Sequence, residues 1–344
     1  MFAEAADIDR RELLEALRAN WGIEAPSLRY EPVGFGSHHY VAVDREGARW
    51  FLTVNDLHRK GWIAPDPADN FGALERAFET ACALRERGLG FVDAPVRHRD
   101  GGVLARVGSR YSLAVFGFID GHPGRFDEKL DRVQLQALLT ALGTLHGSTG
   151  TLRPDLLRRD TLDIPLRGSL QRSMEEVDQP WTGGPFSEVA RRLVAGTVTG
   201  LHERLGLYDE LAEAIRTTGS SWVITHGEPH PGNIMWVDAS LVLIDWDTVA
   251  VGPPERDLWM VELDDGHDLD AYVAAGGATE LRPEALDLYR LWWSLAEVAL
   301  YVDGFRSEHQ DDANTRMALS GLREYLPRSD DSGDDFGARP ESKG

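Results

Sequence analysis

The residues best suited to chemistry lie in the segment THGEPHPGN, residues 225–233, and in the segment IDWD that follows it. The first segment holds one carboxylate, Glu228, and ends at the amide side chain of Asn233, and the second contains Asp245. Prolines and glycines around Glu228 oppose both helix and strand, so we expect a loop. One amide oxygen and one carboxylate suffice for Mg²⁺, which prefers hard oxygen ligands and keeps several waters. The remaining acid, Glu228, can orient and deprotonate an acceptor hydroxyl.

The spacing of these side chains matches that of a phosphoryl-transfer site. The catalytic loop of protein kinases has the pattern H-R-D-x-x-x-x-N and is followed by a metal-binding D-F-G. Here Glu228 lies two residues after His226, Asn233 lies five residues after Glu228, and Asp245 follows a predicted β-hairpin. Because γ-phosphoryl transfer has a loose transition state, catalysis depends mainly on positioning and charge neutralisation. The pattern predicts that Asn233 and Asp245 hold Mg²⁺ while Glu228 positions the acceptor.

The chain resembles the aminoglycoside phosphotransferases, kinase-like enzymes that phosphorylate antibiotics and other small alcohols. Their motif is close to H-G-D-x-H-x-x-N followed by I-D-W, and the segments HGEPHPGN and LIDWD match it. The segments FIDGHPG, LGTLH and PERDL also fit, and IDWD with PERDL is most similar to the spectinomycin-type branch. The resemblance extends over roughly residues 30 to 310. It implies ATP (or GTP) and Mg²⁺ as cofactors, a small-molecule acceptor, and a role for Asp257 in bracing the catalytic loop.

Two departures from the family pattern bear on activity. Glu228 stands where the family has Asp, and a misplacement of about 1 Å can lower a rate about a hundredfold. The third strand, WFLTV, has Thr53 where kinases usually have Lys, and the usual Glu partner of that Lys falls near Ala77. The two losses are mutually consistent, because either charge buried alone would be unfavourable. Another cation must then hold the α- and β-phosphates, and among the candidates at residues 58–60 we favour Lys60.

A glycine-containing loop, GFGS at residues 34–37, lies between the first two predicted strands. It is expected to cover the phosphates, and its candidate nucleotide contacts are Gly34, Gly36 and Ser37. Two glycines in a hairpin are by themselves typical of an ordinary turn, and it is the position of this loop ahead of the catalytic motif that supports a contact with the nucleotide. His38 and His39 beside it are expected to be ordinary surface residues.

The hydrophobic pattern, together with the resemblance, predicts an α+β, bilobal, protein-kinase-like fold with an antiparallel-sheet N-lobe and a mainly helical C-lobe. Strands are expected at residues 28–33, 39–43, 49–54, 94–97, 103–107, 111–118, 234–237 and 241–244. Helices are expected at residues 9–19, 73–87, 130–146, 186–217, 255–263 and 283–305. We place the nucleotide-binding lobe at 1–117, the catalytic and acceptor-binding lobe at 118–327, and a disordered tail at 328–344. The segment FIDGHPG, residues 118–124, is the expected hinge.

Composition bounds the location and the partners. The 344 residues are 42% hydrophobic, which is ample for a core, and they include one cysteine, which excludes a disulfide framework. The N-terminus lacks a basic region followed by an apolar core, and no apolar run approaches a membrane span, so we expect a cytoplasmic protein without a membrane partner. The net charge of −21 argues against nucleic acid. It is compatible with a cationic acceptor, although acidity can also serve solubility alone.

The acceptor site is expected in the helical lobe. Its candidates are acidic and aromatic residues that could hold a cationic sugar or peptide through charge and cation–π contacts: Asp264, Asp265, Asp268, Trp292, Trp293, Glu297 and Tyr301. The alternative is that the tryptophans belong to the core and the acids to a solvated face.

Two other interpretations use the same residues. A zinc site built on His226, Glu228 and His230 would need a helix that Pro229 and Pro231 break, or a later pair of cysteines that the chain lacks. A kinase fold that has lost Lys and Asp could instead bind a nucleotide or small molecule without transferring phosphate. Retention of both predicted metal ligands favours the enzyme over such a binding protein.

Overall fold

The computed structural model describes residues 1–60, 63, 67–218, 221–261 and 269–327. The tail that we expect to be disordered, 328–344, lies outside these residues. The chain divides into two compact units: residues 1–159 with 222–279, and residues 160–221 with the described part of 280–344. All predicted catalytic, metal-binding and nucleotide-contacting residues belong to the first unit. The boundary between lobes after residue 117 stays a prediction.

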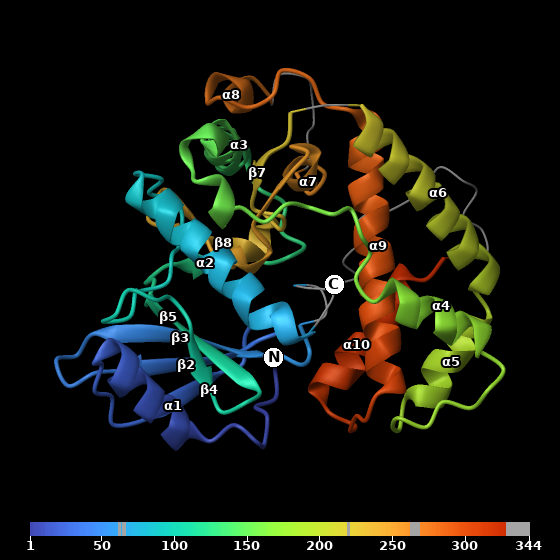
Figure 1. The fold of residues 1–344 in the computed structure, drawn as a ribbon, viewed down its shortest axis with the longest axis horizontal. Helices are drawn as coiled ribbons and strands as arrows, with labels where there is room; N and C mark the ends of the chain where they lie inside the picture. The colour runs from blue at the N-terminus through green and yellow to red at the C-terminus, as the bar shows by residue number, and fades with distance from the viewer. Residues whose placement is uncertain (61–62, 64–66, 219–220, 262–268, 328–344) are drawn as a thin grey trace. The chain divides into compact units, whose positions relative to one another are not determined.

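A five-stranded antiparallel sheet forms the N-terminal part of the first unit (Figure 1), with the strand order β1-β2-β3-β5-β4. The bounds are Leu28–Glu31 for β1, His38–Val43 for β2, Arg49–Asp56 for β3, Ala105–Val107 for β4 and Tyr111–Gly117 for β5. Alternate side chains of β5 face opposite sides of the sheet, so Leu113 belongs to one core cluster and Ala114 to another. Both faces of this sheet are therefore covered.

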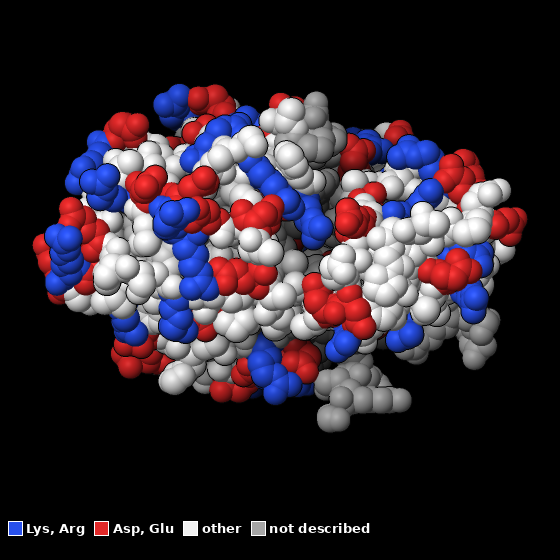
Figure 2. All heavy atoms as spheres, turned by 90° about the horizontal axis from the view of Figure 1, so that it is seen from below, with Lys and Arg blue, Asp and Glu red and all other residues white. Residues whose placement is uncertain are grey.

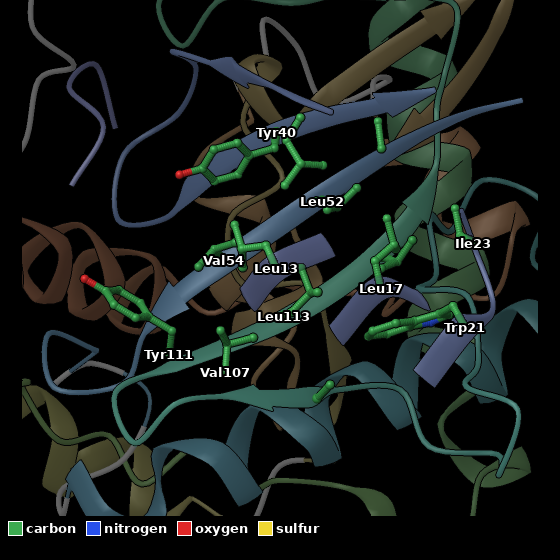
Figure 3. Close-up of a cluster of buried hydrophobic side chains, with 14 residues drawn as sticks. Leu13, Leu17, Trp21, Ile23, Tyr40, Leu52, Val54, Val107, Tyr111 and Leu113 are labelled. Atoms are coloured by element: carbon green, nitrogen blue, oxygen red, sulfur yellow. The ribbon is translucent and has the colours of Figure 1, made fainter. Parts of the chain in front are cut away.

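Helices provide that cover. Helix α1 spans Arg10–Ala16 and continues as a π-helical turn, Leu17–Trp21, and α2 spans Asn70–Glu86. Figure 3 shows Leu13, Leu17 and Trp21 among the side chains of the sheet that form the first cluster. On the opposite face Leu74 and Phe78 of α2 pack with Ala114. The sheet is thus fixed between two helices, which holds β3 and the loop before β2 in place.

The expected strand at residues 94–97 is wrong. The described segment makes one ladder-like bond there, from Val96 N to Val115 O at 2.7 Å, and belongs to no named strand. Pro95 lacks an N–H group and so cannot extend the ladder.

The rest of the first unit carries the predicted catalytic motif. Its helices are α3 (Arg132–Gly147), α7 (Glu255–Leu258) and α8 (Leu269–Ala274). Its strands are β6 (His122–Pro123), β7 (Val223–Thr225), β8 (Ile234–Val237), β9 (Ser240–Leu243) and β10 (Ala250–Gly252). Single 3₁₀ turns span Pro67–Asp69, Thr149–Thr151, Pro154–Leu156, Pro231–Asn233 and Trp246–Thr248. The hairpin β8–β9 confirms the prediction, whereas α7 ends five residues before the predicted end at 263.

The expected hinge is tied to the catalytic hairpin. Within FIDGHPG, His122 and Pro123 form the short strand β6, which pairs with Trp236 and Met235 of β8. The N–H of Gly124 donates to Ile234 O at 2.9 Å. The centre of this segment is therefore a short strand paired with β8, and its role as a hinge stays a prediction.

The second unit is helical among its described residues. Its helices are α4 (Arg167–Glu175), α5 (Ser187–Ala195), α6 (Val198–Thr217), α9 (Pro283–Arg306) and α10 (Ala313–Tyr325). Helix α9 contacts each of the other four. Buried Arg204 of α6 donates to Ser294 Oγ and to Tyr325 O, both at 3.1 Å, which ties three helices together. The sheet-then-helix order confirms the α+β class.

Within the described ranges, no helix is both long and apolar enough to span a membrane. On the face drawn in Figure 2, Lys and Arg side chains lie among Asp and Glu side chains rather than in one basic patch.

The contact between α3 and α8 generates a stability prediction. A Cβ at Gly143 of α3 would fall on the backbone oxygen of Tyr272 and within 2.9 Å of the Ala275 side chain. The substitution Gly143→Ala is expected to lower the free energy of unfolding by about 1–3 kcal/mol, because the packed helices must separate. Urea denaturation followed by circular dichroism measures it.

The matched control is Gly206→Ala on α6, where an added Cβ meets nothing within 4 Å. Ala replaces Gly in a helix interior there and should raise the free energy of unfolding by about 0.5–1 kcal/mol. Equal effects of the two substitutions would contradict the close approach of α3 and α8.

Candidate active site

The predicted catalytic loop begins where β7 ends. Strand β7 pairs antiparallel with β10, so His226 follows a strand with a fixed register. Gly227 has φ of +104°, and a Cβ there would meet the guanidinium of Arg256. Glycine is therefore needed at this position. Residues Pro231–Asn233 then form a 3₁₀ turn that leads into β8.

The buried carboxylate of Asp257 holds the start of this loop. It accepts the backbone N–H of His226 at 2.9 Å and of Gly227 at 2.6 Å, one on each oxygen. His146 Nε2 lies 3.0 Å from the same carboxylate, and His146 Nδ1 lies 2.7 Å from the hydroxyl of Tyr272. Burial alone would raise the pKa of Asp257, but the His146 hydrogen bond and neighbouring positive charges bring that pKa below its ordinary value. Asp257 therefore braces the loop as a carboxylate, as the resemblance implies.

His226 has a structural position. Its side chain is fully buried and packs edge-on against Trp246, with ring centroids 4.6 Å apart. Its Nδ1 accepts the N–H of Glu228 at 3.2 Å, so Nε2 carries the proton and donates to Ile244 O at 2.9 Å. Burial, the largest cause, lowers the pKa of His226 and favours the neutral ring. The ring thereby links the two predicted chemical segments.

The loop brings Asn233 next to Glu228 and to the segment of Asp245. Asn233 Nδ2 donates to the backbone oxygen of Glu228 at 3.0 Å, so its Oδ1 is the atom that can coordinate an ion. The N–H of Ile244 donates to Asn233 O at 3.0 Å, which places Asp245 directly beside this point. The side chain of Glu228 is half-buried.

Asp245 has an unusual backbone and an unusual electrostatic setting. Its φ of 64° and ψ of 66° are left-handed, a conformation that Asp tolerates better than most residues. Asp245 is exposed. Partial desolvation by the surrounding protein, then the like charge of Asp247, raises the pKa of Asp245 to about 7, and the charge of Lys60 opposes the rise. A divalent cation would relieve the crowding of negative charge at this point.

These residues fit a magnesium ion. No cluster of three or more His, Cys, Asp or Glu side chains suited to a metal occurs among the residues that the structure describes. A site with two protein ligands, the Asn233 amide oxygen and the Asp245 carboxylate, is nevertheless what Mg²⁺ uses beside substrate phosphates.

Lys60 is buried and lies in the same unit as these residues. Its Nζ forms an ion pair with Asp247 Oδ2 at 2.7 Å. Thr53, at the strand position usual for Lys, instead lies 3.3 Å from His39 Nδ1 across the β2–β3 pair.

The glycine loop has the expected position between β1 and β2. Gly34 and Gly36 have φ of 67° and 96°, which explains glycine at both. Ser37 is buried, and its hydroxyl donates to Asn55 Oδ1 at 3.0 Å. The amino group of Met1 donates to the backbone oxygens of Gly34 and Ser37, both at 2.8 Å. The loop is therefore anchored at its two ends.

The expectation of an ordinary surface residue is wrong for His38, which is buried, whereas His39 is half-buried. His38 is 7% exposed, and its Nδ1 lies 3.3 Å from the Tyr30 hydroxyl. Burial, the largest cause, lowers the pKa of His38 to about 4 and the pKa of His39 to about 3. His39 also stacks on Phe51, with centroids 5.1 Å apart. Both rings are therefore neutral parts of the fold at pH 7.

The acceptor candidates lie partly outside the described residues and partly in the second unit. Asp264, Asp265 and Asp268 lie outside the described residues. In the second unit, Trp292 Nε1 donates to Asp163 O at 2.8 Å and Trp293 Nε1 donates to the Tyr325 hydroxyl at 3.1 Å. Burial raises the pKa of Glu297, and a hydrogen bond with Tyr301 opposes the rise. Their role as an acceptor site stays a prediction.

An antiparallel sheet followed by a braced loop, a hairpin and an Asp is the arrangement of a protein-kinase-like phosphotransferase. The chain matches the model of the APH family, described as the phosphotransferase enzyme family, over residues 30–292. The chain belongs to this family. The solved relatives described below are small-molecule kinases.

Three relatives extend this comparison. Protein StrN of Streptomyces griseus is 26% identical over an alignment of 346 positions, which covers 95% of this chain and 97% of StrN. The crystal structure of spectinomycin phosphotransferase APH(9)-Ia with ADP and spectinomycin is 17% identical with a TM-score of 0.71, and the match covers 92% of this chain and 94% of that one. The structure of amicoumacin kinase hAmiN is 14% identical with a TM-score of 0.60, and the match covers 92% of this chain and 93% of that one. At these identities the two structures show a shared fold.

Sequence reasoning missed the partners that lie far away in the chain. His146 and Tyr272 complete the brace of Asp257, and Arg158 donates to the backbone oxygen of Asp247 at 3.0 Å. The segments LGTLH and PERDL each match the family pattern. The signal that could have predicted the pair is that the first segment contains His146 and the second contains Asp257, two polar side chains that can bond to each other.

The brace predicts that Asp257→Asn lowers the free energy of unfolding by about 3 kcal/mol, because the amide NH₂ would face a backbone N–H in a buried site. Thermal and urea denaturation measure the change. Asp155→Asn is the control, since the Asp155 side chain is 62% exposed in a surface pair with Arg153 and the substitution should leave the free energy of unfolding nearly unchanged. Similar losses for both variants would contradict the bracing role of Asp257.

Proposed function

We propose that this chain transfers the γ-phosphoryl group of ATP (or GTP), with Mg²⁺, to a hydroxyl of a small molecule of the antibiotic class. The observation that carries the proposal is the pair of hydrogen bonds at Asn233. Its side-chain nitrogen donates to the backbone oxygen of Glu228, and its backbone oxygen accepts the N–H of Ile244, so the backbones of Glu228 and of the Asp245 segment are both bonded to Asn233. Membership of the phosphotransferase enzyme family supports the reaction type.

The protein residues have distinct tasks in this reaction. Asn233 and Asp245 would hold Mg²⁺, which when bound neutralises charge on the phosphates. Glu228 would orient the acceptor hydroxyl and receive its proton. Gly34, Gly36 and Ser37 would cover the phosphates, and Lys60 would supply the positive charge that Thr53 cannot.

The acceptor is proposed to be an aminoglycoside-like or other antibiotic, and a cationic one. The support is a net charge of −21, which attracts cations, and spectinomycin, the antibiotic after which a structural relative is named. The corresponding role would be resistance to that antibiotic.

The test is acceptor-dependent release of ADP. The purified chain is incubated with MgATP or MgGTP and a panel of aminoglycosides, spectinomycin, nucleoside antibiotics and cyclic peptides, and the product is identified by ³¹P NMR. Glu228→Gln is expected to lower kcat about 10²- to 10⁴-fold, because the proton acceptor is lost, with little change in KM for the nucleotide. Glu228→Asp should retain more activity than Glu228→Gln.

Glu213→Gln, which changes an exposed carboxylate on α6, is the control and should leave kcat unchanged. Nucleotide binding without acceptor-dependent release of ADP, and with equal ADP release by the wild type and Glu228→Gln, would contradict phosphotransfer. That result would favour a kinase fold that only binds its ligands.

A further inference from the structure

The ion pair of Lys60 lies outside the elements that carry such a pair in protein kinases. There, a Lys on the third strand pairs with a Glu on the following helix, and the pair must be in place for phosphoryl transfer. Here Thr53 occupies the strand position, and Ala77 on α2 is fully buried. Lys60 comes after β3, is 2% exposed, and pairs with Asp247, two residues beyond the predicted metal ligand Asp245.

A second side chain fixes both halves of this pair. Arg158 Nη1 donates to the backbone oxygen of Asp247 at 3.0 Å, and Arg158 Nη2 donates to the backbone oxygen of Ile63 at 2.7 Å. Ile63 N in turn donates to Lys60 O at 2.9 Å. One guanidinium therefore links Ile63, and through it Lys60, to the segment that carries Asp247. The planar fork of Arg suits such two-point binding.

The surroundings of Lys60 contain the other predicted nucleotide contacts. The charge of Lys60 acts on Asp245, on His39 beside the glycine loop, and on the amino group of Met1, which is bonded to that loop. A cation at this point is thus within electrostatic range of the predicted metal ligand and of the phosphate-covering loop. Its burial also means that it requires a fixed partner.

We infer that Asp247 and Arg158 are positioning residues that hold Lys60 against the nucleotide phosphates, so that the support of the phosphate-binding lysine comes from the metal-ligand segment instead of α2. This inference rests on the proposed function, because it assumes that a nucleoside triphosphate binds beside Asp245. It couples two parts of the site: displacement of residues 245–247 moves both the metal ligand and the lysine.

The experiment measures binding by isothermal titration calorimetry with MgATP or MgGTP, whichever binds more tightly, and with the corresponding nucleoside. Lys60→Met should weaken triphosphate binding at least tenfold and leave nucleoside binding within twofold, since the nucleoside has no phosphates. Asp247→Asn should weaken triphosphate binding several-fold in the same selective manner. Equal affinity of wild type and Lys60→Met for the triphosphate would overturn the inference.

A double variant separates positioning from folding. Either single variant removes one charge of a buried ion pair and can lose stability for that reason alone. The double variant, Lys60→Met with Asp247→Asn, removes both charges. Its melting temperature should return toward that of the wild type, while its triphosphate binding should stay at least tenfold weaker than that of the wild type. Recovery of triphosphate binding together with stability would overturn the inference and leave the pair a purely structural role.

The role of Arg158 is tested by a double-mutant cycle. Arg158→Met should weaken triphosphate binding several-fold in the wild-type background and have no further effect in the Lys60→Met background, because it acts through the lysine. Arg159→Met is the matched control: the Arg159 guanidinium lies over the Trp222 ring at 4.2 Å and should not affect binding. Independent losses at Lys60 and Arg158 that multiply would overturn the positioning role of Arg158.

The two levels of the proposal fail differently. A wild-type chain that binds neither triphosphate would overturn the proposed function and this inference with it. A wild-type chain that binds a triphosphate and transfers its phosphate, with affinities insensitive to Lys60, Asp247 and Arg158, would overturn this inference alone.

Discussion

The site depends on the hydrogen bonds that two successive backbone N–H groups donate to one buried carboxylate. Asp257 fixes His226 and Gly227, and the ring of His226 then reaches Ile244, so the catalytic loop and the segment of Asp245 share one anchor. A carboxylate buried without such donors would be strongly unfavourable. The hydrogen bonds that stabilise Asp257 are therefore the same ones that shape the loop, and stability and site geometry have a common source.

The sequence was sufficient where the geometry is local. Glu228, Asn233 and Asp245 lie within a short stretch, and the glycine, the prolines and the hairpin between them leave few ways to connect them. The alternating strands and periodic helices likewise predicted the α+β order, because burial on a covered face leaves a period in the sequence. The exact roles of Glu228, Asn233 and Asp245 in catalysis stay predictions.

The sequence was insufficient where partners are distant or where both faces of an element are covered. Lys60 and Asp247 are 187 positions apart, and His146 and Asp257 are 111 apart, so no local pattern pairs them. His38 was expected at the surface because it adjoins a loop, but β2 lies in a sheet with helices on both sides. The absence of Lys at Thr53 indicated that a cation was needed elsewhere, and tertiary structure was required to show how Lys60 is held.

The central claim is that the loop braced by Asp257 presents Asn233 and Asp245 to one divalent ion. Crystals grown with Mn²⁺ and a non-hydrolysable ATP analogue test it most directly, because anomalous scattering locates the ion without assumptions about the protein. The account predicts a manganese peak about 2.1 Å from Asn233 Oδ1 and from a carboxylate oxygen of Asp245, with remaining positions filled by phosphate and water. A nucleotide-bound crystal with its manganese peak on other residues, and neither of these two side chains in contact with the ion, would contradict it.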